Sequence, residues 1–156
     1  MTWYFDSHIH LSDPVYFSDM KFILKEMEYL KIKACCVSMN YENSLQTLEL
    51  AKKNDLVLPF IGIHPECADD ELESMMNLIE ENHYNISGIG EIGLDPTYAN
   101  NNNDVKRQNH VFESLLSSAD SSLTLSAPAF FRILYIADNP NSDDFMNIVL
   151  IFSEKR

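Results

Sequence analysis

The chain has 156 residues, enough for one domain with a hydrophobic core, whereas a complete (β/α)8 barrel normally needs at least about 200 residues. A hydrophobic content of 46% and a mean hydropathy of −0.18 exclude a disordered or collagen-like chain. The net charge of −13, from 11 Lys and Arg against 24 Asp and Glu, excludes broad binding of nucleic acid through a basic surface.

Cysteine usage and the N-terminal segment indicate the compartment. Cys35, Cys36 and Cys67 form neither a C-x-x-C motif nor a disulfide framework, which is typical of a reduced, cytosolic protein. The N-terminus lacks the charged region and long apolar run of a signal peptide, and no apolar run is long enough to span a membrane. We therefore expect a cytoplasmic protein with no membrane partner.

The first half of the sequence predicts two strand–helix units. Residues 3–6 form a short apolar run. From Ser18 onward, apolar residues recur at spacings of three and four, which is the pattern of an amphipathic helix with Ser18 as its N-cap. Residues 32–37 are typical of a buried strand, and a second helix ending near Asn54 is marked by Leu45, Leu48 and Leu50.

Two further units follow. The apolar run 56–63 predicts a third strand, although Pro59 cannot donate a hydrogen bond within a central strand. Residues 86–92 predict a fourth strand, and a fourth helix begins at Asp104. A third helix is predicted between these two strands. Its core-facing residues are expected to be Leu72, Met75, Met76 and Ile79. Four strand–helix units in succession predict an α/β fold with a parallel sheet.

The pattern changes after Leu116, where a serine-rich segment begins. Two apolar runs beyond it, 129–136 and 148–152, are candidate strands. We therefore divide the chain into a domain at 1–116 and a tail at 117–156. We expect this tail to be divergent or the product of a frame shift.

The residue types that bind metals follow three of the four predicted strands. The carboxyl ends of parallel strands meet at one edge of the sheet, where ligands bind in α/β folds. In D-x-H-x-H, an extended segment points Asp6, His8 and His10 to one side, so that they can converge on one ion. Neutral imidazoles are good ligands for zinc and related divalent metals. The alternative is that these are polar loop histidines without a partner.

Glu91 lies within an apolar segment, G-I-G-E-I-G-L-D at 88–95. A buried carboxylate is costly unless it is paired or binds a metal, so Glu91 is either a metal ligand or the partner of a buried Arg or Lys. The neighbouring glycines would let backbones approach and leave room for the carboxylate: Gly88, Gly90 and Gly93. They do not form a dinucleotide-binding motif, because they lie inside a strand and do not open a helix.

Three other histidines carry weaker signals. His64 directly follows the third strand in G-I-H-P-E at 62–66, where it could contact a substrate or cap the turn; the sequence does not separate these roles. His83 and His110 fall at a helix end and on a helix, where we expect surface or packing roles.

Four ordered motifs resemble the TatD family of metal-dependent deoxyribonucleases and hydrolases: F-D-S-H-I-H-L at 5–11, G-I-H-P-E at 62–66, G-E-I-G-L-D at 90–95 and K-R-Q-x-x-x-F at 106–112. The resemblance covers residues 1–116. It implies an amidohydrolase-like TIM barrel, one or two divalent metal ions (Mg, Mn or Zn), and DNA phosphodiester bonds as the substrate.

The resemblance also implies roles for single residues. His8 and His10 would bind one metal ion, Glu91 would be placed to bridge two, and His64 would lie near the substrate phosphate. No catalytic role is assigned to the residues that match the helix motif: Arg107, Gln108 and Phe112.

The sequence departs from the family in two places. Ser12 stands where the family usually has Asp or Asn, and no histidine follows His110 to supply two later ligands of the family. We therefore expect an incomplete TIM-barrel-like repeat of about four units, with sheet edges open to self-association, and little or no nuclease activity from the isolated chain. The alternatives are a small-molecule amidohydrolase and a non-enzymatic remnant.

Overall fold

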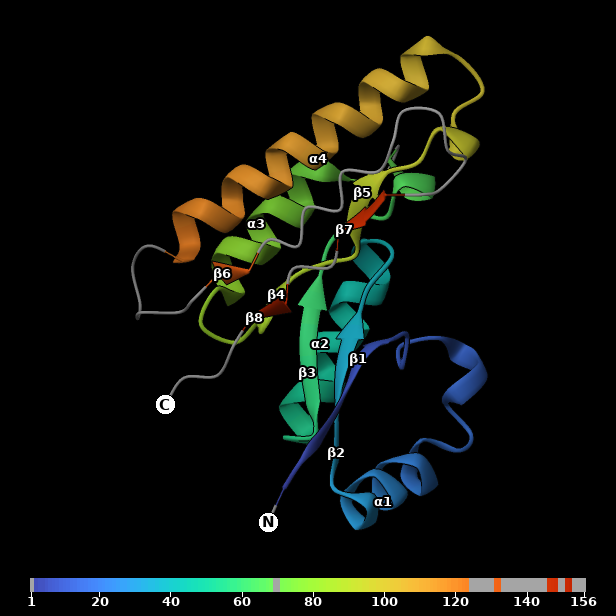
Figure 1. The fold of residues 1–156 in the computed structure, drawn as a ribbon, viewed down its shortest axis with the longest axis vertical. Coiled ribbons are helices and arrows are strands. Elements are labelled where there is room, and N and C mark those ends of the chain that lie inside the picture. Colours follow the sequence, from blue (N-terminus) through green and yellow to red (C-terminus); the bar gives the residue numbers. More distant parts are fainter. Residues whose placement is uncertain (1, 69–70, 124–130, 133–145, 149–150, 153–156) are drawn as a thin grey trace.

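A computed structural model describes residues 2–68, 71–123, 131–132, 146–148 and 151–152 (Figure 1). Its main sheet has four parallel strands in the order β1-β2-β3-β4, with bounds Tyr4–Ile9, Ile32–Val37, Val57–Ile61 and Gly88–Ile89. A helix follows each of these strands along the chain: α1 (Met20–Leu30), α2 (Tyr41–Lys53), α3 (Leu72–Asn82) and α4 (Asn102–Leu123). The structure thus confirms an α/β fold with four strand–helix units.

Short 3-10 helices lie in three of the loops: η1 (Pro14–Tyr16), η2 (Pro65–Cys67) and η3 (Pro96–Tyr98). Each has proline in its first turn and is capped by the side chain of the preceding residue: Asp13, His64 and Asp95. Proline suits a first helical turn because it has no N–H to leave unpaired. The loops after β1 and β3, and the loop that contains η3, are therefore held by local hydrogen bonds.

Two buried clusters join the helices to one face of the described sheet, and a third cluster of Cys35, Val37 and Phe60 lies on the opposite face. One joins α3 and α4, which lie side by side in Figure 1, to the sheet through Ile61, Ile63, Met75, Leu78, Ile79, Ile89, Ile92 and Leu115. The second joins α1 to the sheet through Leu11, Met27, Ala34, Cys36, Leu56 and Val57. The inward positions of Met75 and Ile79 were predicted; Met76 is only partly buried.

One detail of the predicted helices is wrong. Asp19, and not Ser18, is the N-cap of α1. Leu45 is 40% exposed, whereas Ser44 and Thr47 are fully buried. The Thr47 hydroxyl accepts a hydrogen bond from the Ser38 hydroxyl at 3.0 Å, so α2 packs on β2 through a paired polar contact.

Pro59 lies in β3, between β2 and β4, and so occupies a central strand. Its carbonyl still accepts a hydrogen bond from the Ser87 N–H at 2.7 Å. Pro59 therefore still accepts a hydrogen bond although it cannot donate one, and the predicted third strand is confirmed.

The predicted fourth strand at 86–92 is divided in the structure. β4 ends at Ile89, and β5 (Ile92–Leu94) begins after Glu91 and pairs antiparallel with β7 (Met146–Ile148). The Gly90–Glu91 peptide bond is cis. Glu91 therefore lies at the carboxyl end of the parallel sheet and not within a strand.

The C-terminal prediction is only partly covered. Of the candidate strands 129–136 and 148–152, most residues lie outside the described part of the chain, which contains β6 (Phe131–Arg132) paired with β8 (Ile151–Phe152). α4 continues to Leu123, past the proposed division at residue 116. The division into 1–116 and 117–156 stays a prediction.

Three other expectations concern membrane spans, the cysteines and the open edge of the sheet. No helix among the described residues is long and apolar enough to cross a membrane. None of the three cysteines, all in the described part of the chain, forms a disulfide, and burial raises the pKa of the Cys35 thiol to about 11. β1 lies at one end of the sheet order and is largely exposed, as an open edge would be, but self-association itself stays a prediction.

Candidate metal centre

His8, His10 and Glu91 come together at the carboxyl ends of β1 and β4. The two Nε2 atoms lie 3.2 Å apart, and each is 3.5 Å from Glu91 Oε2. The Glu91 side chain is only 8% exposed, whereas the two imidazoles are about one-third exposed. Three groups that can bind a metal therefore converge on one point that is open to solvent on the histidine side.

Their spacing suits a tetrahedral metal ion. Zinc with metal–nitrogen distances of about 2.0–2.1 Å holds its ligand atoms about 3.3 Å from one another. The separations of 3.2, 3.5 and 3.5 Å are close to the edges of such a tetrahedron. The residues present therefore fit a divalent ion, with further coordination positions left for other ligands.

The hydrogen bond of His10 selects the tautomer that binds metals. Nδ1 of His10 lies 3.1 Å from the Val37 carbonyl oxygen, and a carbonyl can only accept, so Nδ1 carries the proton. In the neutral ring, Nε2 then offers a lone pair toward Glu91 and His8. Burial lowers the pKa of His10, although Glu91 opposes this shift, and so favours the neutral ring. A backbone carbonyl that orients a metal-binding histidine is a common outer-shell arrangement.

Glu91 is held by backbone hydrogen bonds to the end of β2. Its N–H donates to the Ser38 carbonyl at 2.9 Å, and the Gly90 carbonyl accepts from the Ser38 N–H at 3.4 Å. Within the described part of the chain, its ion-pair partners are the three imidazoles of His8, His10 and His64. The alternative of a buried Lys or Arg partner therefore finds no support among these residues.

His64 caps η2 and also faces the cluster. Its Nδ1 accepts a hydrogen bond from the Glu66 N–H at 3.2 Å, which places the proton of the neutral ring on Nε2. Nε2 lies 3.8 Å from Glu91 Oε1, and the side chain is 12% exposed. The sequence left capping and substrate contact open; capping is observed, and in this tautomer His64 faces the site with an N–H donor.

Other residues near the predicted sheet edge lie outside the cluster. Asp6 was expected to converge with the histidines, but its Oδ1 accepts a hydrogen bond from the His8 N–H at 3.1 Å. The pairing of β1 with β2 shifts register between Asp6 and Ile9, which disturbs the simple alternation. Asp95 caps η3, and His83 Nδ1 donates a hydrogen bond to the Glu80 carbonyl at the end of α3.

Comparison with known families decides the identity. The profile described as TatD related DNase matches residues 5–125, more than half of the chain. The chain belongs to this family. The TatD match ends at residue 125, beyond the predicted boundary at 116.

Curated relatives are similar over about three quarters of the chain. An uncharacterized metal-dependent hydrolase of Methanocaldococcus jannaschii is 32% identical over 75% of this chain and 46% of its own length. A relative from Mycoplasma genitalium with the same description is 32% identical over 76% of this chain and 47% of its own length. The chain therefore spans about half the length of these relatives.

A solved TatD structure shows the fold. The structure of YjjV, a TatD homologue from Escherichia coli, superposes on this chain with a TM-score of 0.65 at 22% sequence identity. The match covers 76% of this chain and 47% of the YjjV chain. The fold of this TatD chain is thus an incomplete TIM-barrel-like repeat, as the sequence predicted.

Two residues that matter for the TatD site were not predicted to do so. Gly62, on β3's carboxyl side, lies against the backbone of Gly90 and Glu91, because a Cβ there would be 2.9 Å from the Glu91 carbonyl oxygen. The sequence predicted close backbone approach at the glycines of 88–95, yet a Cβ on Gly90 would meet Phe60 only at 3.9 Å. A glycine within a strand pattern is itself a signal of close backbone approach, and it was present in G-I-H-P-E.

Gln108 is the second such residue. It is buried in α4, and its amide brackets Asp95: Oε1 accepts from the Asp95 N–H at 3.0 Å, and Nε2 donates to the Asp95 carbonyl at 2.8 Å. Nε2 also lies 3.4 Å from the Pro65 carbonyl. Gln108 therefore ties the loop that carries His64 to the loop that follows Glu91.

We expect Gln108→Leu to lower the free energy of unfolding by about 1–2 kcal/mol, because the partly buried Asp95 N–H would lose its acceptor and the Asp95 and Pro65 carbonyls would each lose one of two donors. Urea denaturation measures this change. Asn109→Leu is the matched control, since among the described residues the Asn109 amide donates only to the Val105 carbonyl within α4, and it should change stability by less than about 0.5 kcal/mol. Equal effects of the two variants would contradict the bracing role.

Proposed function

We propose that this TatD family chain is a metal-dependent hydrolase acting on the phosphodiester bonds of DNA. The observation that carries the proposal is the triangle of His8, His10 and Glu91, of tetrahedral size, beside the N–H of His64. A divalent ion held there would polarise a phosphoryl oxygen and lower the pKa of water to near 7.

The residues of the chain have separate roles in this proposal. His8, His10 and Glu91 hold the ion; the Val37 carbonyl keeps His10 in the required tautomer. His64 donates from Nε2 to a phosphate oxygen of the substrate, since its Nδ1 is already occupied by the Glu66 N–H.

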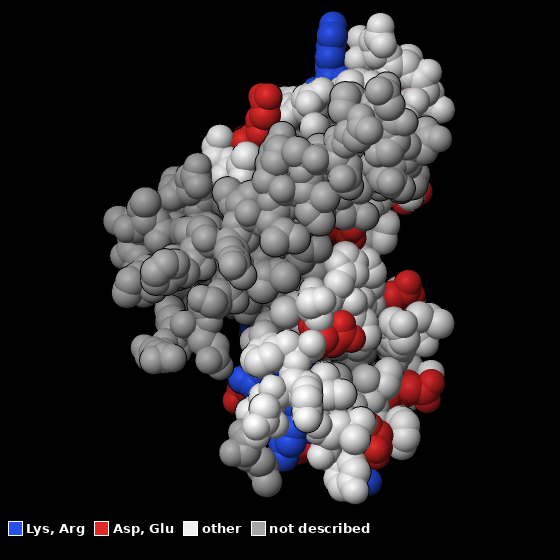
Figure 2. All heavy atoms as spheres, viewed as in Figure 1, with Lys and Arg blue, Asp and Glu red and all other residues white. Residues whose placement is uncertain are grey.

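The charge of the chain supports a substrate held locally. In Figure 2, the Lys and Arg side chains of the described residues form only small, separate groups on the visible face, with acidic side chains between them. A net charge of −13 opposes binding of a polyanion along an extended surface. One or two divalent ions at the site would offset this repulsion where the phosphate binds.

The first experiment measures metal binding and DNA cleavage by the full chain. We expect Zn²⁺ or Mn²⁺ to bind at one site and to support slow cleavage of a DNA oligonucleotide, slow because the described residues supply only three ligands. His8→Ala should abolish both. His110→Ala is the matched control, because this exposed histidine on α4 lies outside the cluster and should leave both unchanged.

The other outcomes favour other functions. Metal-dependent hydrolysis of amides or esters, with DNA left intact, would contradict the nuclease proposal and indicate a small-molecule amidohydrolase. Metal binding without hydrolysis of either class would leave the metal site but contradict a hydrolase in this chain. Binding of much less than one metal ion per chain, in an amount that His8→Ala does not change, would indicate a non-enzymatic remnant.

A further inference from the structure

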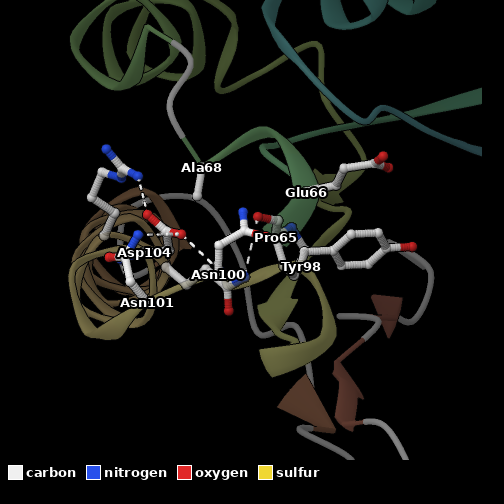
Figure 3. Close-up of a pocket in the computed structure, with 9 residues that line it drawn as sticks. Pro65, Glu66, Ala68, Tyr98, Asn100, Asn101 and Asp104 are labelled. Atoms are coloured by element: carbon white, nitrogen blue, oxygen red, sulfur yellow. Dashed lines mark hydrogen bonds and ion pairs between the residues drawn. The ribbon is translucent and has the colours of Figure 1, made fainter.

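A cavity of about 340 Å³ lies between η2 and the start of α4 (Figure 3). Its lining residues come from the loops after β3 and β5 and from the first turns of α4: Pro65, Glu66, Ala68, Tyr98, Asn100, Asn101, Asp104, Arg107 and Gln108. The volume lies within the range of small-molecule sites, about 300–1,000 Å³. The function proposed above assigns no role to this cavity.

The cavity wall at α4 is fixed by hydrogen bonds. Oδ1 of Asn101 accepts from the N–H groups of Asn103 and Asp104, while Asp104 Oδ2 accepts from the Asn100 N–H and the Asn101 amide. Arg107 pairs with Asp104. On the opposite side, the Gln108 amide reaches the Pro65 carbonyl. These hydrogen bonds hold the cavity wall at α4 in place without a ligand.

Tyr98 connects the cavity to the metal centre. Its ring lies edge-to-face with the His64 imidazole, with ring centroids 5.4 Å apart, and the residue is 44% exposed. In Figure 3 the Tyr98 ring projects away from α4, beside Glu66. His64 Nε2 is itself 3.8 Å from Glu91 Oε1, so Tyr98 is linked to the metal cluster through His64.

The chemistry of the lining favours a neutral, planar ligand. Two carboxylates line the cavity, and the one cation among its residues, Arg107, is paired with Asp104, so a phosphate group is disfavoured. Among the described residues, the Asn100 side-chain amide makes no hydrogen bond, which leaves a donor and an acceptor for a ligand. An amide with both functions matches the edge of a nucleobase, and an exposed tyrosine ring offers a stacking surface.

We propose that this cavity binds a nucleobase of the nucleic-acid substrate, with Tyr98 as the stacking surface and Asn100 as the partner of the base edge. The proposal rests on the function proposed above, because it places the base beside a phosphate held at the metal centre. Stacking tolerates every base, whereas the single amide selects among base edges only weakly.

The test is binding of a phosphorothioate oligothymidine, resistant to hydrolysis, to the zinc-loaded full chain, followed by fluorescence anisotropy. Tyr98→Ala should raise Kd about 5- to 100-fold, as expected for the loss of one stacked base. Tyr98→Phe retains the ring and should stay within about twofold of the parent chain. Tyr84→Ala is the matched control, since Tyr84 is 69% exposed and also contacts a histidine, His83, outside the site.

An abasic oligonucleotide of equal length separates base contacts from backbone contacts. It should bind the parent chain more weakly and should not distinguish Tyr98→Ala from the parent. Each of three results would overturn the proposal. Tyr98→Ala could leave Kd for oligothymidine unchanged, or it could raise Kd for the abasic strand as much as for oligothymidine. The parent chain could also fail to bind oligothymidine. Zinc affinity of each variant, measured alongside, shows whether the metal centre is intact.

The two proposals fail in distinguishable ways. Base binding is scored without turnover, so loss of the nuclease activity alone does not change its result. Conversely, an unchanged Kd for Tyr98→Ala, together with DNA cleavage by the parent chain, would refute the base site and leave the nuclease proposal standing.

Discussion

Glu91→Gln is expected to weaken Zn²⁺ binding by at least about 100-fold, since even outer-shell partners of metal ligands contribute 10- to 100-fold. The substitution keeps the shape of the side chain but replaces an anionic ligand by a neutral amide. In the structure, Oε2 of Glu91 is the atom that faces both Nε2 atoms, at 3.5 Å from each. Isothermal titration calorimetry of the metal-free chain measures the change.

Without metal, the Glu91→Gln chain should be as stable as the parent chain or more stable. Glu91 is buried, and burial lowers the pKa of His10, which favours the neutral ring and weakens its ion pair with Glu91. Removing a buried charge without a strong partner does not cost stability. A Glu91→Gln variant that unfolds much more easily without metal would indicate a structural role for the carboxylate.

Glu66→Gln is the matched control for this prediction. Glu66 is exposed on η2 and lies near the site, but its carboxylate is not among the three converging groups. Its Zn²⁺ affinity should equal that of the parent chain. Unchanged affinity in Glu91→Gln, or equal losses in both variants, would contradict the assignment of Glu91 as a ligand.

The predicted elements of the fold followed from local patterns. The apolar run 32–37 coincides with β2, and α2 ends before Asn54, as the sequence indicated. The convergence of His8, His10 and Glu91 was also predictable, because parallel strands place their carboxyl ends at one edge. Their assignment as ligands of a bound metal stays a proposal.

Other features depend on contacts between distant segments, which periodicity does not record. Gln108 looked like one polar residue of a helix motif, and only the fold brings it to Asp95 and Pro65. The tautomer of His10 depends on the Val37 carbonyl, which lies on another strand. The break after β4 was hidden because Glu91 is flanked by apolar residues and glycines that continue the pattern of a strand.

The C-terminal boundary shows the same limit. The sequence placed it at residue 116, where the apolar stripe of the fourth helix is lost. α4 nevertheless runs to Leu123 and the family match to residue 125. A helix can continue without its apolar stripe when other interactions hold its backbone, so loss of periodicity is a weak marker of a boundary.

Gly62→Ala is expected to destabilise the chain by about 3 kcal/mol, at the upper end for an added methyl group in a packed interior. The new Cβ would lie 2.9 Å from the Glu91 carbonyl oxygen, 2.9 Å from the Gly90 carbonyl carbon and 3.0 Å from Ile92 Cγ2. Two of these atoms belong to the backbone, which cannot yield as the end of a side chain can. Urea denaturation measures the loss.

The same substitution should also weaken Zn²⁺ binding, because relief of the clash moves the backbone that carries Glu91. Gly90→Ala is the matched control: it is adjacent to Glu91, but its Cβ would meet Phe60 at an ordinary 3.9 Å. We expect Gly90→Ala to cost less than about 1 kcal/mol. If Gly90→Ala proved as harmful as Gly62→Ala, flexibility at the break between β4 and β5, and not the close approach of Gly62, would determine where Glu91 lies.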